Sequence, residues 1–119
     1  MTPKPPQKPP RGSEDLGRVA LLQVLRELNK SAQAATHPED NGLELREIMD
    51  RLTESQAGRA GAMRVPVILG TLVQNGMVDY VGTKVYSWVR QRDVRDRYVI
   101  TTQGKEFLRL NVETNDRIT

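Results

Sequence analysis

The stretch LELREIMDRLTESQAGRAGAMRVPVILGTLVQNG, residues 43–76, decides the fold. Its first part, residues 45–52, places apolar side chains at i, i+3, i+4 and i+7, which predicts a short helix with one buried stripe. A polar break with glycines follows. The apolar run at 62–74 predicts a second helix, and Asn75-Gly76 ends it because glycine accepts the left-handed backbone at a helix C-terminus. Pro66 fits if that helix starts near Arg64, where a missing N–H does no harm.

The residues after Gly76 predict a β-hairpin and a last helix. Residues 77–81 form an apolar strand that resumes at 85–89, and Gly82 marks the break between the two pieces. Residues 90–97 are predicted as a charged turn. The chain returns as a strand from Tyr98, and Thr101 or Thr102 caps a helix that ends near Leu110.

Two motifs in this part of the chain carry a family resemblance. The first is Leu-x-x-Asn-Gly-Met-Val at 72–78, and the second is Tyr-x-Ile-Thr-x-x-Gly-Lys-x-Phe-Leu at 98–108. Together with the helix pair before them, they resemble the winged-helix DNA-binding domains of small transcriptional regulators, in the broad MarR/PadR/ArsR-like sense. The resemblance covers roughly Leu16–Leu110. It implies a helix-turn-helix whose second helix reads DNA, with a hairpin wing beside it.

The expected fold is α+β, a winged helix-turn-helix in the order helix, short strand, helix, helix, strand, strand, helix. A first helix from Ser13 to about Ala34 precedes the helix pair. Residues 1–12 are rich in proline and cations, so we expect a disordered arm. The winged-helix domain spans 13–110, and the polar residues 111–119 are expected to form a flexible tail.

Composition excludes several classes of protein. The chain of 119 residues has no cysteine, which rules out disulfides, thiolate metal sites and a cysteine nucleophile. No apolar run reaches the ~20 residues of a membrane span. No glycine-rich phosphate loop or interpretable carboxylate pair is present, and we expect His37 to be an ordinary surface residue. We therefore predict a cytoplasmic protein that is not an enzyme and needs no cofactor or metal.

Charge is distributed unevenly along the chain. Residues 12–50 carry four Lys/Arg against eight Asp/Glu, whereas residues 51–109 carry ten against five. A basic second half that contains the reading helix and the wing favours a polyanionic partner, double-stranded DNA. The alternative is that these charges only solvate the surface.

The predicted DNA-binding residues lie on the second helix and the wing. Val65, Ile68 and Leu69 are expected to face the core together with Leu72, which leaves the other side of the helix outward. Five cations in the wing are expected to meet phosphates or the minor groove; the alternative is a polar turn with internal Arg–Asp pairs. The predicted contacts are Arg59, Arg64, Val67, Thr71, Gln74, Lys84, Arg90, Arg92, Arg95 and Arg97.

The first helix is apolar nearly all round at 19–25, which predicts that it buries two sides. One side is the core. A homodimer partner would cover the other through Val19, Leu22 and Arg26, unless the chain's own loop or last helix does so.

The sequence therefore predicts a small DNA-binding transcriptional regulator, with no residue pattern that marks a small-molecule effector. A winged helix that binds another protein is the alternative, and it would expose an apolar patch where a DNA reader carries cations. RNA is a further possible partner.

Overall fold

The computed structural model describes residues 11–118, and the side chains of residues 16–111. Within that range the chain is a mixed α+β protein with two small antiparallel sheets. The helices are α1 (Arg11–Ala34), the 3-10 helix η1 (Pro38–Asp40), α2 (Leu45–Thr53), α3 (Gly58–Met63), α4 (Val65–Gln74) and α5 (Thr102–Ile118). The strands are β1 (Leu43–Glu44), β2 (Val78–Val81), β3 (Val85–Ser87), β4 (Arg92–Val94) and β5 (Arg97–Ile100).

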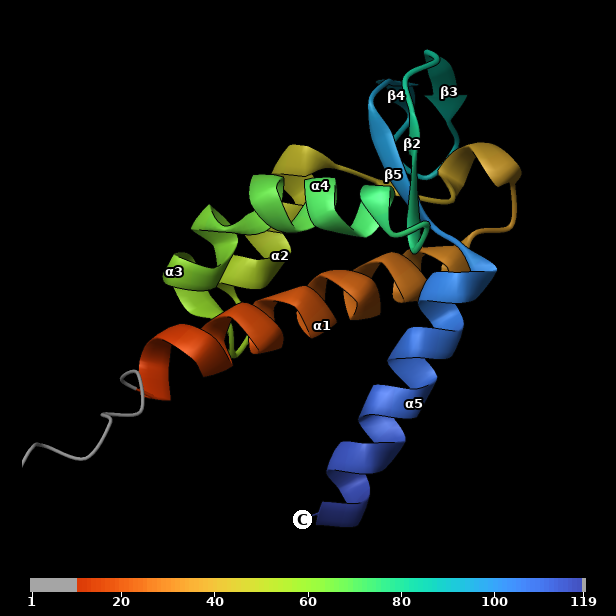
Figure 1. Ribbon diagram of the computed structural model, residues 1–119. Coiled ribbons are helices and arrows are strands. Elements are labelled where there is room, and N and C mark those ends of the chain that lie inside the picture. Colours follow the sequence, from red (N-terminus) through yellow and green to blue (C-terminus); the bar gives the residue numbers. More distant parts are fainter. Residues whose placement is uncertain (1–10, 119) are drawn as a thin grey trace, which may run out of the picture.

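Helix α1 is the base on which the rest of the molecule is built (Figure 1). Helices α2, α3 and α4 pack against it on one side, and α5 and β5 also contact it, with Arg18 donating to Asn111 Oδ1 of α5 at 3.0 Å. Other elements of the same chain therefore cover the apolar side chains of α1. The fully buried core contains Leu25, Leu28, Ile48, Leu52, Leu69 and Leu72.

The second helix of the predicted pair is divided in two at Arg64. The amide of Arg64 donates to Gly61 O at 3.0 Å, which tightens the end of α3. Pro66 then stands in the first turn of α4, where its missing N–H leaves no helical bond unmade. The expected start near Arg64 is confirmed, while the break places Arg59 on a separate short helix, α3.

The two sequence motifs, one containing Gly76 and the other Gly104, lie in contact in the structure. Gly76 has φ +73, and the amide of Met77 donates to Leu72 O at 2.9 Å, so α4 ends in a Schellman motif. Thr101 Oγ1 donates to Gly76 O at 2.7 Å and accepts the amide of Gly104 at 3.0 Å, which caps α5. A Cβ on Gly104 would collide with the carbonyl oxygen of Met77. These contacts fix the end of α4 to the start of α5.

The hairpin contains one strand more than predicted, β4, and divides into two pairs of strands. Strand β5 lies between β1 and β2, with Tyr80 opposite Tyr98, and β3 pairs with β4 in a second sheet. The β3–β4 turn falls at residues 88–91 and not at 90–97, and β4 occupies part of the predicted turn. The predicted break at Gly82 is confirmed, because β2 ends at Val81.

The chain ends differ from the expected boundaries. Helix α1 begins at Arg11, and α5 continues past Leu110 to Ile118, through most of the predicted tail. The predicted disordered arm lies outside the described residues, apart from its last two positions. None of the described helices is long and apolar enough to cross a membrane.

Candidate nucleic-acid interface

Helix α4 presents one side to the core and the other to solvent, as its spacing predicts. All four residues expected to face inward are buried: Val65, Ile68, Leu69 and Leu72. The outward positions Val67, Thr71 and Gln74 are exposed. The orientation of this helix follows directly from its apolar period.

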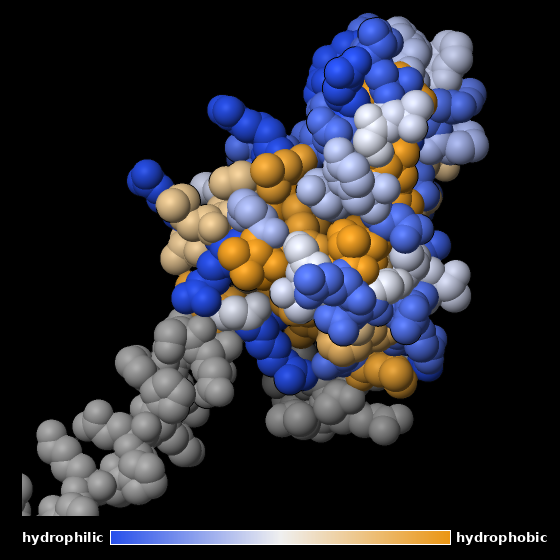
Figure 2. Space-filling model, turned by 45° about the horizontal axis from the view of Figure 1, so that its top comes forward, coloured by the Kyte–Doolittle hydropathy of each residue, from blue (hydrophilic) through white to orange (hydrophobic). Residues whose placement is uncertain are grey.

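The outward side of α4 carries no charge. Val67 is 75% exposed and Met63, at the end of α3, is 69% exposed. No atom lies within 4 Å of where a Cβ on Gly70 would stand, so this part of the helix backbone is open to solvent. In Figure 2, apolar side chains gather below the hairpin, whereas the hairpin itself is mostly hydrophilic.

The two arginines near the start of α4 differ in where they point. A Cβ on Gly17 would lie 3.9 Å from Nη1 of Arg64, which shows that this guanidinium folds back toward α1. Arg59 is exposed on α3. Arg64 is therefore displaced from the outward face on which the sequence placed it.

Charged side chains of both signs stand near the α4 face. One shallow hollow is lined by Arg46, Arg59 and Met63 together with Asp50, and another by Arg46, Arg95 and Tyr80 together with Glu44 and Asp96. Arg46 belongs to both hollows and joins them. Sequence reasoning missed Arg46, although it lies on the polar side of the helix at 45–52. Arg46, Arg59 and Arg95, named here the edge arginines, form no ion pair with another described side chain.

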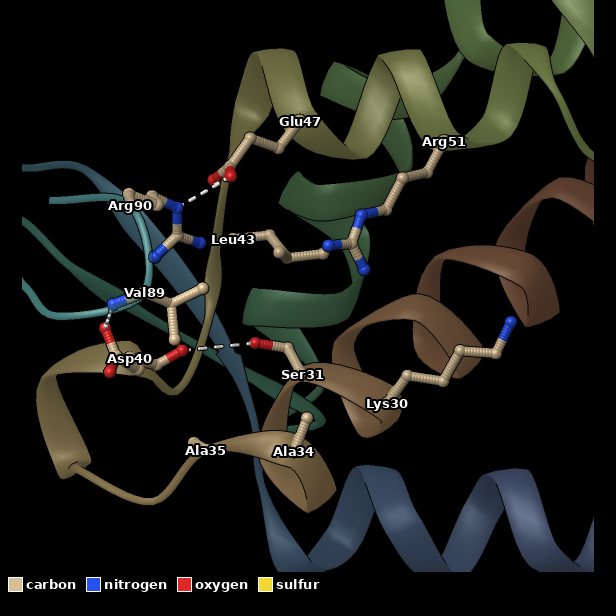
Figure 3. Close-up of a pocket in the computed structure, with 10 residues that line it drawn as sticks. All are labelled: Lys30, Ser31, Ala34, Ala35, Asp40, Leu43, Glu47, Arg51, Val89 and Arg90. Carbon is tan, nitrogen blue, oxygen red and sulfur yellow. Dashed lines mark hydrogen bonds and ion pairs between the residues drawn. The ribbon is translucent and has the colours of Figure 1, made fainter.

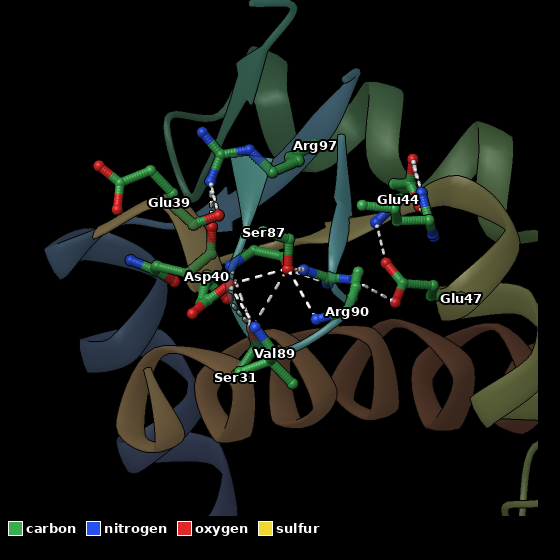
Figure 4. Close-up of polar contacts among 12 residues, drawn as sticks. Ser31, Glu39, Asp40, Glu44, Glu47, Ser87, Val89, Arg90 and Arg97 are labelled. Carbon is green, nitrogen blue, oxygen red and sulfur yellow. Dashed lines mark hydrogen bonds and ion pairs between the residues drawn. The ribbon is translucent and has the colours of Figure 1, made fainter. Parts of the chain in front are cut away.

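The β3–β4 turn folds back onto the body of the molecule (Figure 4). Ser87 Oγ donates to Asp40 Oδ1 at 2.8 Å, and the amide of Val89 donates to the same oxygen at 3.3 Å. Asp40 is itself buried at the end of η1. The 88–91 turn therefore lies against the body of the molecule, and the exposed bend at residues 82–84 and 95–96, between the two strand pairs, forms the free end of the hairpin.

Arg90 fastens this turn to α2 and to the loop before β1. Its Nε donates to Glu47 Oε2 at 2.7 Å and its Nη2 donates to Gly42 O at 2.9 Å. The side chain is only 12% exposed. The prediction that Arg90 contacts DNA is therefore not supported by its position, because its donors are already used within the chain.

Arg97 is more deeply enclosed. It is 6% exposed, and its Nη1 donates to the carbonyl oxygens of Glu39 at 3.0 Å and Asn41 at 2.7 Å. It holds the η1 loop against β5. The prediction that Arg97 contacts DNA is wrong, because a buried guanidinium bound to backbone carbonyls cannot reach a phosphate.

Two further hairpin cations have acidic partners. Arg92 Nη2 lies 2.6 Å from Glu44 Oε1, and Lys84 Nζ lies 3.8 Å from Asp93 Oδ2. The alternative of internal Arg–Asp pairs does not describe this hairpin. Among the described residues its one internal ion pair is Lys84–Asp93, and Arg90 and Arg92 pair with Glu47 and Glu44 outside it.

The carboxyl groups of this network are held ionised. Burial alone would raise the pKa of Asp40, but hydrogen bonds from Ser87 and the Val89 amide outweigh it and lower the pKa below its usual value. Burial likewise opposes ionisation of Glu47, and the hydrogen bond from Arg90 lowers its pKa overall. The network stabilises the folded hairpin in its charged form.

A cavity of about 240 Å³ lies beside this network (Figure 3). Leu43 and Val89 form apolar walls, Ser31 and Asp40 lie at one side, and Lys30 stands on α1 at the other. Ser31 Oγ accepts the amide of Gly42 at 3.0 Å and lies 3.2 Å from its carbonyl oxygen. Ser31 is thereby occupied in holding α1 to the β1 loop.

The predicted dimer residues lie mostly inside the protomer. Leu22 is 5% exposed in the core, and Val19 packs against that core. Arg26 is half-buried and lines a crevice between α1 and α2. The prediction of Leu22 as an interface residue is wrong, since no partner can reach it, and the chain's own helices cover α1.

Aromatic side chains gather on the outside of the β3–β4 turn. The Trp88 ring lies 5.1 Å from His37 and 5.4 Å from Tyr86, centroid to centroid. Trp88 and Tyr86 are both about half exposed. Trp88 therefore packs against the loop that carries His37.

Comparison with protein-family models, with curated proteins and with solved structures gives no match to this chain. Within the described residues, no group of three or more His, Asp or Glu side chains could hold a metal ion. The function must therefore be argued from the geometry of the chain itself.

Proposed function

We propose that the chain is a winged-helix protein that binds double-stranded DNA with a sequence preference and acts as a transcriptional regulator. Helix α4 enters the major groove, and the edge arginines contact phosphates on either side. The tip of the β2–β5 hairpin lies along the neighbouring backbone or minor groove. The observation that carries the proposal is the exposed α4 with cations around it, next to a projecting hairpin.

Physical chemistry supports this docking in two ways. The major groove, about 12 Å wide, admits one α-helix, and α4 has a fully exposed outward side. Arginines without an acidic partner can exchange the counterions of DNA for themselves, which drives binding to any sequence. Phosphate contacts of this kind set position and orientation, and the helix face then supplies preference.

The test is a fluorescence anisotropy titration of random duplex DNA at two salt concentrations. If the edge arginines (Arg46, Arg59 and Arg95) each neutralise one phosphate, affinity should fall about 40-fold between roughly 50 and 200 mM salt. This is less than the five hairpin cations would give if all were available, because Arg90 and Arg97 are used within the chain and Lys84 and Arg92 have acidic partners. Affinity that ignores salt, or no binding at low salt, would contradict the proposal.

A second candidate is a winged helix that docks another protein. One observation favours it: a shallow apolar groove between α4 and the hairpin, lined by Pro66, Gly70, Val73, Tyr80 and Tyr98. Exposed apolar grooves of this kind often mark protein interfaces. Absence of duplex binding at low salt would leave this candidate as the better account of the same face.

A further inference from the structure

The chemistry of the α4 face limits what it can recognise in a groove. From Val65 to Gln74 the helix has no charged residue, and Val67, at 75% exposed, is the more exposed of its two exposed valines. The hydroxyl of Thr71 donates to Val67 O at 3.2 Å and is therefore partly used within the helix. Gln74 alone offers an exposed amide on the outward side.

Such a face has few groups with which to distinguish bases by hydrogen bonds. Guanine and cytosine present N7, O6 and N4 in the major groove, and adenine and thymine present N7, N6 and O4, so the polar atoms of either base pair need partners when water is removed. Thymine also presents a 5-methyl group, which is the apolar contact point of the major groove. Val67 can bury that methyl group, whereas its side chain offers no hydrogen bond to the polar atoms of either base pair.

Gly70 adds a second, independent observation. It lies three residues after Val67 on the same side of the helix, and the space where its Cβ would stand is empty. A base edge can therefore approach the helix backbone at this position more closely than any side chain would allow. Methyl groups of neighbouring thymines can then pack beside Val67, because no side chain at position 70 occupies that space.

We propose that α4 reads thymine methyl groups, with Val67 as the main contact, so that the preferred duplexes are A·T-rich. The amide of Gln74 pairs with adenine in the same sites. This inference rests on the proposed DNA binding and deepens it by naming what the helix reads. It predicts selectivity for a single methyl group at C5 of a pyrimidine.

The experiment compares duplexes that differ only in that methyl group. The full chain is titrated against an A·T-rich duplex and against the same duplex with deoxyuridine in place of thymidine. Affinity should drop about fourfold for each methyl group that is buried in the complex. In a G·C-rich duplex, replacing cytosine by 5-methylcytosine should raise affinity, because it restores a methyl group at the same position.

Two variants show whether α4 makes the discrimination. Val67→Ser removes the apolar contact and should abolish the difference between thymine and uracil. Val89→Ser is the matched control, because Val89 is 74% exposed, close to Val67, but lies on the β3–β4 turn. That control should keep the full difference.

The outcomes separate the two levels of the proposal. Equal binding of thymine and uracil duplexes by the natural chain overturns methyl reading and leaves DNA binding intact. A difference that survives in Val67→Ser also overturns it, since duplex shape would then be the cause. Failure to bind any of these duplexes at low salt overturns the proposed function itself.

Discussion

The β3–β4 turn and the outward face of α4 are both predicted to bind DNA, but they differ in the direction and chemistry of their side chains. In this turn and at the start of β5, Arg90 and Arg97 point inward and bind Glu47 and backbone carbonyls. On α4, the outward residues are exposed as predicted, but none of them is charged. A run of arginines in a sequence is thus weaker support for an interface than the direction in which each guanidinium points.

The largest expected effect is at Arg97. Replacing it with alanine leaves buried carbonyls of the η1 loop without donors, so Arg97→Ala should destabilise the fold by about 3 kcal/mol. Urea denaturation measures it. Arg95→Ala, two residues earlier and exposed, is the control and should change stability by less than about 0.5 kcal/mol. Equal effects would mean that the buried and exposed arginines do not differ in role.

The contrast between Arg95 and Arg97 also shows what a sequence can predict. The Schellman motif at Gly76 and the Thr101 cap depend on neighbouring residues, so local patterns predicted both correctly. The helical spacing of apolar residues also predicted which side of α4 faces the core and which side faces solvent. The partners of Arg97 lie near residue 40, more than fifty positions away, and no local pattern indicates them.

The same limit applies to the rest of the candidate site. Nothing in the sequence places Asp40 beside Ser87 or Glu47 beside Arg90, because these partners are 47 and 43 positions apart. The sequence indicates that α1 has apolar residues on two sides. Whether a partner or the chain itself covers the second side depends on the path of α5, which the sequence does not show. The homodimer stays a prediction, and Leu22 no longer supports it.

A smaller effect is expected where the turn meets α2. Arg90→Ala should cost about 2 kcal/mol, because it removes a charge-assisted hydrogen bond to Glu47 and another to Gly42 O. A double-mutant cycle with Glu47→Gln should give a coupling of about 1–2 kcal/mol. A coupling near zero would show that the pair does not hold the turn.

The same network predicts how stability depends on pH. The pKa values of Asp40 and Glu47 are lowered in the folded state, from ordinary values of 3.8 and 4.5. Their contribution is therefore present above those ordinary values and is lost as the pH falls through the lower folded values. Urea denaturation at about pH 6 and pH 3 should show a steeper loss for the natural chain than for Glu47→Gln. Identical slopes would contradict the network.

The smallest effect is at Gly70, on the face that the sequence predicted well. Gly70→Ala should raise stability by about 0.5–1 kcal/mol, since alanine favours the helix and its Cβ meets no atom. Thermal denaturation measures this gain. If methyl groups are read there, the added Cβ should also weaken binding to the A·T-rich duplex. Stabilisation without any change in affinity would place the contact elsewhere on α4.

The proposed function requires that the edge arginines face the DNA, while Arg90 and Arg97 stay bound within the chain. The most direct measurement compares two triple alanine variants that remove equal charge. One replaces Arg46, Arg59 and Arg95, and the other replaces Arg18, Lys30 and Lys105 on α1 and α5. The slope of log affinity against log salt should become shallower by about 2.7 in the first variant and stay unchanged in the second. Equal changes in both variants would contradict the claim, because binding would then follow net charge and not this face.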